Sequence, residues 1–162
     1  MILLVRKSVS ATGLVLYEGS AYDGDWSDGF SAGSGSRSKE SDHLYLLSEG
    51  GSPSGERSYV TNTKVDLTEY SDLKVDWALT QEVGAAVAHL IVDSRDGYDA
   101  VERGLNEGVV PGLNDYGPFT RTTTTLDVSG KSGGHFVRLH SFAGHHLSDR
   151  KAHLYVYKVW LE

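Results

Sequence analysis

Alternation of apolar and polar residues constrains this chain more than any other feature of its sequence. The segment 73–79 reads Leu-Lys-Val-Asp-Trp-Ala-Leu, so apolar residues occupy every second position. An extended strand with this pattern buries one face and leaves Lys74 and Asp76 on the other. No stretch of the chain shows the sustained 3.6-residue period of an amphipathic helix. We therefore expect strands to dominate the fold.

Several other segments have the same strand-like character, being rich in β-branched, aromatic or alternating apolar residues. They are residues 1–5, 13–17, 43–47, 57–61, 85–93, 120–126, 134–142 and 152–161. So many short strands at close spacing predict an all-β fold, an antiparallel β-sandwich of the jelly-roll kind. The 19 glycines suit tight turns between strands. Ser31–Ser41 is rich in Gly and Ser and is predicted to be a flexible loop.

The length of 162 residues suits a single domain with its own core. We expect one β-sandwich domain over residues 1–162, with residues 1–40 combining an attachment arm and the first strands. The chain has no cysteine, which excludes disulfides, thiolate zinc sites and Cys nucleophiles.

Charge and hydropathy exclude two classes of partner. The net charge is −7, and the 15 Lys and Arg residues are scattered without a basic run, which argues against a nucleic-acid partner. The apolar start Met1–Val5 is far too short for a membrane span or a signal peptide. We therefore expect no membrane partner and synthesis in the cytoplasm without secretion.

One acidic, aromatic segment, Tyr-Asp-Gly-Asp-Trp-Ser-Asp-Gly-Phe beginning at Tyr22, has the character of a binding site. Asp23, Asp25 and Asp28 offer the hard oxygen ligands that calcium takes, although their spacing departs from the usual calcium loop and no closing Glu follows. Trp26 and Tyr22 could instead stack on a sugar ring while the acids accept its hydroxyl protons. A third interpretation is an acidic turn that anchors Trp26 in the core. All three remain open from the sequence.

Aromatic residues in predicted loops are the best candidates for a glycan site. They are Tyr22, Trp26, Tyr98 and Tyr116. Five histidines lie in the last 28 residues, but without the spacing of metal ligands, and His135, His140 and His153 are expected at exposed strand positions. No catalytic motif is present, so we expect no enzymatic activity and no cofactor other than calcium.

Three pieces of the sequence resemble a known family. They are Val65-Asp-Leu-Thr-Glu-Tyr-Ser-Asp-Leu-Lys-Val-Asp-Trp77 after Val60–Lys64, Thr124-Thr-Leu-Asp-Val-Ser-Gly130 before the strand 134–140, and Ala152-His-Leu-Tyr-Val-Tyr-Lys-Val-Trp-Leu-Glu162. In this order they resemble a β-sandwich domain of tail-associated and other virion proteins from phages and prophages of Gram-positive bacteria. The resemblance covers Val60–Glu162 except for Gly97–Phe119. It supplies no catalytic or binding residues.

The resemblance implies a jelly-roll-like, lectin-like domain carried on a virus particle. On that basis we expect a virion structural protein that contacts other virion proteins, binds a host cell-surface glycan and assembles as a homo-oligomer such as a trimer. A free-standing carbohydrate-binding module is the alternative, and a polysaccharide-cleaving enzyme is a further one, because carboxylate pairs have no fixed spacing in sequence.

Overall fold

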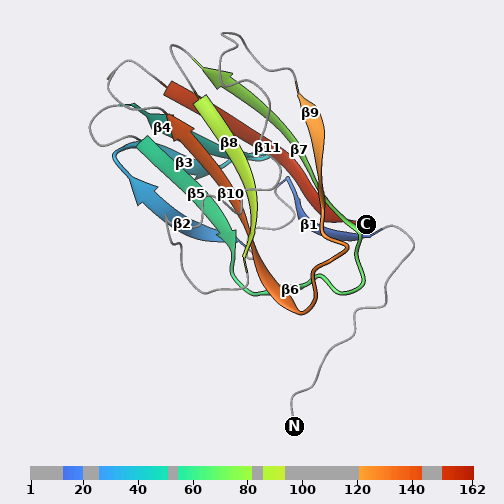
Figure 1. Ribbon diagram of the computed structural model, residues 1–162. Helices are drawn as coiled ribbons and strands as arrows, with labels where there is room; N and C mark the ends of the chain where they lie inside the picture. Colours follow the sequence, from blue (N-terminus) through green and yellow to red (C-terminus); the bar gives the residue numbers. More distant parts are fainter. Residues whose placement is uncertain (1–12, 20–25, 51–54, 82–85, 94–120, 144–150) are drawn as a thin grey trace.

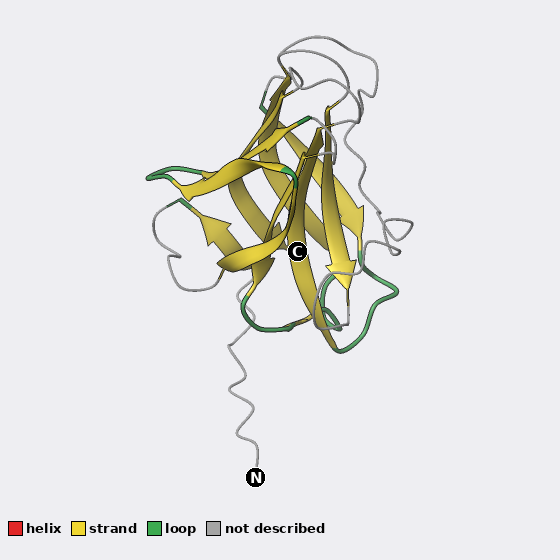
Figure 2. Ribbon diagram, turned by 90° about the vertical axis from the view of Figure 1, so that its left-hand side faces the viewer, coloured by secondary structure: helices red, strands yellow, loops and turns green. Residues whose placement is uncertain are grey.

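The chain folds into two stacked antiparallel sheets (Figures 1 and 2). The computed structural model describes residues 13–19, 26–50, 55–81, 86–93, 121–143 and 151–162. Within these ranges there are eleven strands: β1 (Leu14–Glu18), β2 (Trp26–Ala32), β3 (Ser34–Lys39), β4 (Leu44–Glu49), β5 (Gly55–Thr61), β6 (Val65–Asp66), β7 (Asp72–Gln81), β8 (Ala86–Asp93), β9 (Thr122–Asp127), β10 (Gly134–Ala143) and β11 (Lys151–Leu161). The described part contains no helix long and apolar enough to cross a membrane.

The two sheets share the strands unequally. The six-stranded sheet has the order β3-β4-β11-β7-β9, with β1 also paired to β11. The five-stranded sheet has the order β2-β5-β10-β6, with β8 also paired to β10. Every strand pair is antiparallel. The predicted all-β antiparallel sandwich is therefore confirmed, and the C-terminal strand β11 lies in the middle of the larger sheet.

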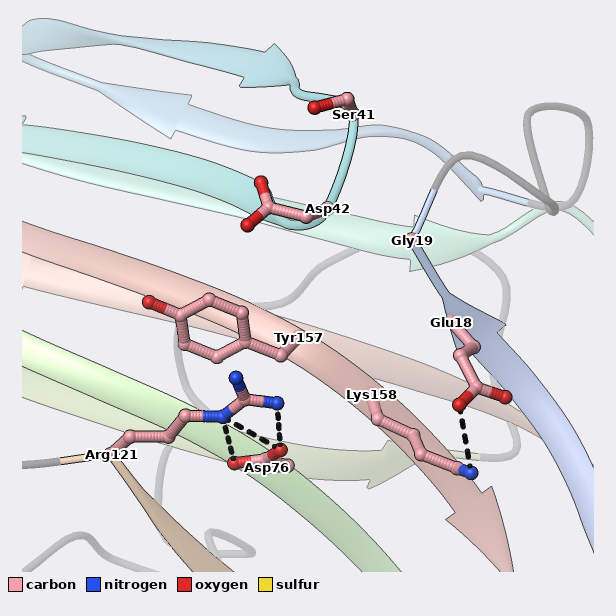
Figure 3. A pocket seen from close by; sticks show the side chains of 8 residues that line it. All are labelled: Glu18, Gly19, Ser41, Asp42, Asp76, Arg121, Tyr157 and Lys158. Carbon is pink, nitrogen blue, oxygen red and sulfur yellow. Dashed lines mark hydrogen bonds and ion pairs between the residues drawn. The ribbon is translucent and has the colours of Figure 1, made fainter.

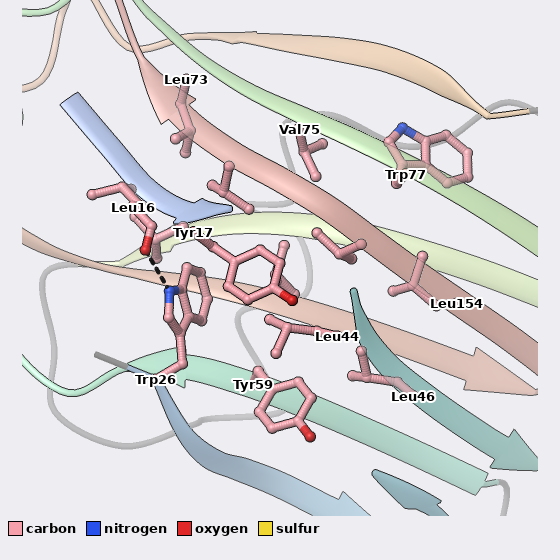
Figure 4. Packing of buried hydrophobic residues seen from close by; sticks show 14 of the residues in the cluster. Leu16, Tyr17, Trp26, Leu44, Leu46, Tyr59, Leu73, Val75, Trp77 and Leu154 are labelled. Carbon is pink, nitrogen blue, oxygen red and sulfur yellow. Dashed lines mark hydrogen bonds between the residues drawn. The ribbon is translucent and has the colours of Figure 1, made fainter. Parts of the chain in front are cut away.

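Apolar residues of both sheets meet in one core (Figure 4). On β7 the alternation works as predicted, since Leu73, Val75, Trp77 and Leu79 are all buried. The indole of Trp77 donates to Thr124 Oγ1 at 2.8 Å, so its one polar atom is satisfied. Burial of one face of β7 fixes the opposite face as the outside of the sheet.

The Gly/Ser-rich segment Ser31–Ser41 was predicted to be a loop. Instead it contains the end of β2 and the whole of β3. Gly33 takes the turn between them at φ 59°, and Gly35 on β3 has φ 140°. A side chain at Gly35 would bring its Cβ within 2.1 Å of Leu47 O on β4. Small residues are thus required here by close strand approach rather than by flexibility, and this is why composition alone misled the prediction.

A buried arginine holds this corner of the sandwich together. Arg57 on β5 donates to the carbonyl oxygens of Ala32, Gly33 and Gly35 at 2.7, 3.1 and 2.9 Å, and to Glu56 O at 2.6 Å. These bonds tie the β2–β3 turn to the five-stranded sheet. Burial, reinforced by the nearby Arg37 charge, lowers the pKa of Arg57 from its ordinary value.

One histidine expected at an exposed strand position is buried. His140 on β10 is 1% exposed, and its Nε2 lies 3.2 Å from Glu56 Oε2 on the neighbouring strand β5. Alternation places both side chains on the outer face of the five-stranded sheet, so the sequence pattern gave no sign of burial there. The cross-strand pairing satisfies two polar groups that burial would otherwise penalise.

Two turns at one end of the sandwich have the same construction. Asp66 Oδ1 accepts hydrogen bonds from Thr68 N and Thr68 Oγ1 at 3.0 and 2.7 Å. Asp127 Oδ1 accepts from Ser129 N and Ser129 Oγ at 2.9 and 2.6 Å. In each turn the intervening residue is a buried aliphatic side chain. Hydrogen bonds to the ionised form lower the pKa of both carboxyl groups.

Candidate glycan-binding face

The outer face of the six-stranded sheet carries the candidate site, and β11 supplies most of it. Leu154, Val156 and Val159 of this strand point into the core, where each is at most 2% exposed. Alternation turns Tyr155 and Trp160 to the other face, where both are partly exposed. Tyr155 lies between β4 and β7, and Trp160 lies between β1 and β7, so both aromatic side chains lie away from the edges of the sheet.

Pairing of β4 with β11 gathers aromatic side chains from distant parts of the sequence. Tyr45 lies directly opposite Tyr155, and their ring centroids are 5.3 Å apart. The Tyr45 hydroxyl lies 2.8 Å from His153 Nδ1. His43 lies 5.3 Å from Tyr155 and 5.7 Å from Tyr157, measured between ring centroids. We call the partly exposed set the aromatic strip; its members are His43, Tyr45, His153, Tyr155, Tyr157 and Trp160.

A polar cleft of about 390 Å³ opens beside the aromatic strip (Figure 3). The cleft is lined by Glu18, Gly19, Ser41, Asp42, Asp76, Arg121, Tyr157 and Lys158. A β-bulge in β11 shapes it, because Val156 pairs with Trp77 and Lys158 pairs with the next residue, Asp76. Tyr157 is thus the extra residue, and both it and Lys158 line the cleft.

Arg121 and Asp76 form the centre of the cleft. Arg121 Nε lies 3.0 and 2.9 Å from the two carboxylate oxygens, and Nη2 donates to Oδ2 at 2.6 Å. The guanidinium carbon also lies 3.9 Å from the centroid of the Tyr157 ring. The hydrogen bonds to Asp76 raise the pKa of Arg121 above its ordinary value. The Arg121 side chain is 57% exposed and therefore within reach of a ligand.

The remaining charges around the cleft are also paired. Lys158 Nζ lies 3.1 Å from Glu18 Oε1 on β1. Asp42 Oδ1 lies 2.7 Å from His43 Nδ1, which joins the cleft to the aromatic strip. The cleft therefore combines three carboxylates with two permanent cations, and each of those cations already faces a carboxylate.

Trp26, predicted as an exposed stacking platform, lies in the core instead (Figure 4). It is 2% exposed, and its Nε1 donates to Leu16 O on β1 at 2.9 Å. A ring enclosed in this way offers no face to a sugar, so the interpretation that placed Trp26 in the core was correct. The other predicted glycan residues, Tyr22, Tyr98 and Tyr116, lie outside the described residues.

The predicted calcium loop is described only at its last ligand. Asp28 on β2 is 67% exposed in its side chain and pairs with Arg37 Nη2 at 3.0 Å. Asp23 and Asp25 lie outside the described residues. Among the residues that are described, no three His, Cys, Asp or Glu side chains gather in a way that could hold a metal ion. Calcium binding by this segment remains a prediction from the sequence.

The aromatic strip was not predicted from the sequence, because glycan-binding aromatic residues were expected in loops. The alternation His153-Leu-Tyr155-Val-Tyr157 was visible, and it predicted that these residues share one face of a strand. Their neighbours could not be predicted, since Tyr45 is 108 residues from His153 and Asp76 is 45 residues from Arg121. Only the strand order brings these groups together.

Comparison with solved structures shows that carbohydrate-binding modules have a similar fold. A family 29 carbohydrate-binding module from Piromyces equi aligns over 94% of this chain and 91% of its own, with a TM-score of 0.53 and 17% identity. A second family 29 module aligns over 94% and 89%, with a TM-score of 0.52 and 14% identity. At such low identity the likeness establishes a shared fold. No protein-family model and no curated protein matches the sequence.

Proposed function

We propose that this chain is a carbohydrate-binding module that holds a glycan against the outer face of its six-stranded sheet. The observation that carries the proposal is the coincidence of the aromatic strip and the polar cleft on one face of a fold shared with such modules. Flat aromatic faces contact the apolar side of a sugar ring, and flanking polar groups bind its hydroxyls.

The placement of the aromatic strip supports binding of a chain of sugars rather than a single ring. His153 and Trp160 are seven residues apart on β11, which corresponds to about 20 Å along an extended strand. All residues of the strip except His43, which immediately precedes β4, lie on paired strands, so their side chains need little ordering when a ligand binds.

Charge favours an uncharged glycan. Glu18, Asp42 and Asp76 outnumber the two permanent cations of the cleft, and Arg121 and Lys158 are both already paired with carboxylates. The excess negative charge of the cleft would repel an anionic sugar, and both cations that could attract it are already paired with carboxylates.

The solved relatives support polar recognition of this kind. Two variants of a family 29 module replace one arginine and one aspartate by alanine, and both are described as probing the mechanism of ligand recognition. An arginine and aspartates also line the cleft of this chain.

The role in a virion, which the sequence resemblance predicts, is not part of this proposal. The modules named above are carbohydrate-binding modules and are not described as virion proteins. Placement on a phage particle, contacts with other virion proteins and a trimeric state stay predictions from the sequence resemblance. A host cell-surface glycan bound by this face would be compatible with that placement and equally with a free-standing module. The expectation of a non-enzymatic role agrees with the binding function of the similar structures.

The test is retention of the purified chain on neutral polysaccharides: cellulose, mannan, xylan and galactan. Tyr155→Ala removes a ring from the aromatic strip and is expected to weaken binding at least about tenfold, the effect of losing one well-packed aromatic contact. Phe136→Ala is the matched control, because alternation places Phe136 on the outer face of the other sheet, where Lys64 lies 5.5 Å from its ring. Equal loss in both variants, or no retention of the wild-type chain, would refute the proposal.

A further inference from the structure

Arg121 is held in place with part of its hydrogen-bonding capacity unused. Asp76 engages Nε and Nη2, which leaves Nη1 without a hydrogen-bond partner among the described residues. Figure 3 shows Nη1 directed away from Asp76 and beside the Tyr157 ring. A guanidinium fixed by two such contacts loses little freedom when a ligand binds to its remaining donors.

The same guanidinium covers the Tyr157 ring. Its carbon lies 3.9 Å from the ring centroid, which is direct contact, so this face of Tyr157 is closed to a sugar. At this point of the aromatic strip a ligand therefore meets hydrogen-bond donors instead of an aromatic surface.

Unused acceptors lie close to these donors. One carboxylate oxygen of Asp42 lies beside His43, while the other has no hydrogen-bond partner in the described part of the chain. The Tyr157 hydroxyl likewise makes no hydrogen bond within that part. Figure 3 shows Asp42 and Arg121 on either side of Tyr157. A sugar hydroxyl both donates and accepts, and it could satisfy a donor and an acceptor on the two walls at once.

We infer that Arg121 determines the specificity of the cleft: with Asp42 it selects the orientation of the hydroxyls on one sugar unit of a neutral glycan chain. This inference rests on the proposed function. The aromatic strip supplies contact that tolerates different sugars, since ring stacking depends little on hydroxyl configuration. The cleft supplies discrimination, because a hydroxyl of the wrong orientation leaves Arg121 or Asp42 unpaired in the complex.

The test compares two ligands that differ only in the orientation of one hydroxyl per sugar unit, cellohexaose and mannohexaose, by isothermal titration calorimetry. Wild-type protein is expected to prefer one of them by about tenfold or more, the ratio that one lost hydrogen bond to a charged group produces. Arg121→Ala should bring the two affinities within about threefold of each other, mainly by weakening the preferred hexaose. Lys64→Ala is the control, since Lys64 is another exposed cation in contact with an aromatic ring, Phe136.

Arg121→Lys separates hydrogen-bond geometry from charge. Lysine keeps the positive charge but lacks the planar guanidinium, which binds Asp76 with two nitrogens and keeps the third, Nη1, available. The Arg121→Lys variant should therefore lose the preference between the two hexaoses, as Arg121→Ala does. A wild-type ratio below about threefold, or an unchanged ratio in Arg121→Ala or Arg121→Lys, would overturn the inference while leaving glycan binding intact. Failure of the wild-type chain to bind either hexaose or any of the four polysaccharides would instead remove the proposed function on which the inference rests.

Discussion

Replacement of Arg57 by alanine should destabilise the sandwich more than any surface substitution. Arg57 is 8% exposed and donates to four carbonyl oxygens, three of them in the β2–β3 connection. A hydrogen bond from a charged donor contributes about 1.5–3 kcal/mol, but such contributions within one cluster are not additive. Water can also reach carbonyls beside the edge strand β3 once the side chain is gone. We therefore expect a loss of about 3–5 kcal/mol in the free energy of unfolding, at the upper end for point substitutions.

Urea unfolding followed by tryptophan fluorescence measures this loss, because Trp26 and Trp77 are both buried in the core. Arg57→Lys should recover about half of the lost stability, since an ammonium reaches fewer of the carbonyls than the guanidinium. Hydrogen exchange adds a local measurement: amides of β3 should lose protection in Arg57→Ala before those of β7 do. A loss below about 1 kcal/mol, with β3 amides still protected, would show that the Gly/Ser-rich strand does not depend on Arg57.

Four further outcomes follow from the structure. Trp26→Phe removes the hydrogen bond to Leu16 O and part of a buried ring, so it should cost about 2–3 kcal/mol in urea unfolding, whereas glycan retention by the folded protein should not change. The pKa values of Asp66 and Asp127 are lowered in the folded state. The stability that these carboxylates contribute is therefore present above the unfolded pKa near 3.8 and is lost as pH falls through the folded values. Below pH 3.8 the urea midpoint should decline more steeply in wild-type protein than in Asp66→Asn. Burial, with a further contribution from the Asp28 charge, raises the pKa of Tyr59 to about 12. An ultraviolet titration should therefore show one tyrosine that ionises at higher pH than the others and that is missing in Tyr59→Phe. The stability linked to this group should be lost as pH rises from about 10 toward about 12. Carboxymethylation of whichever neutral polysaccharide retains the chain should weaken its retention, with the difference shrinking as salt is added; equal retention of the modified and unmodified forms at low salt would contradict the charge argument.

The fold could be predicted from the sequence wherever burial leaves a period-two pattern. Segment 73–79 shows this most clearly, because the apolar residue at every second position from Leu73 to Leu79 is buried in the core, while Lys74 and Asp76 lie on the opposite face. The prediction failed where tertiary contacts override local preference. Ser31–Ser41 has the composition of a linker, but Arg57 and the close approach of β4 make part of it a strand. A contact made by a residue 22 positions away in sequence cannot be inferred from local composition.

The candidate site was harder to predict than the fold, for a related reason. The acidic segment around Trp26 looked like a site because an aromatic residue beside carboxylates suits a sugar, and the same residues suit a strand that begins with a core indole. The difference depends on which carbonyl meets the indole nitrogen, and Leu16 O lies on a separate strand. Residues that do form the outer face, such as Tyr45 and Tyr155, show only ordinary strand alternation in the sequence.

The β-bulge at Tyr157 links the fold to the proposed function. A regular strand would turn Lys158 inward after Tyr157 had pointed outward, and would shift Val159 and Leu161 to the outer face. The extra residue avoids both outcomes, since Val159 and Leu161 remain buried while Tyr157 and Lys158 both line the cleft. One irregularity in the central strand thus places two adjacent functional groups beside Asp76 without loss of core packing. The bulge thus supplies Tyr157 and Lys158 to the polar cleft, whose other walls come from neighbouring strands and from the turns that contain Gly19, Ser41 and Asp42.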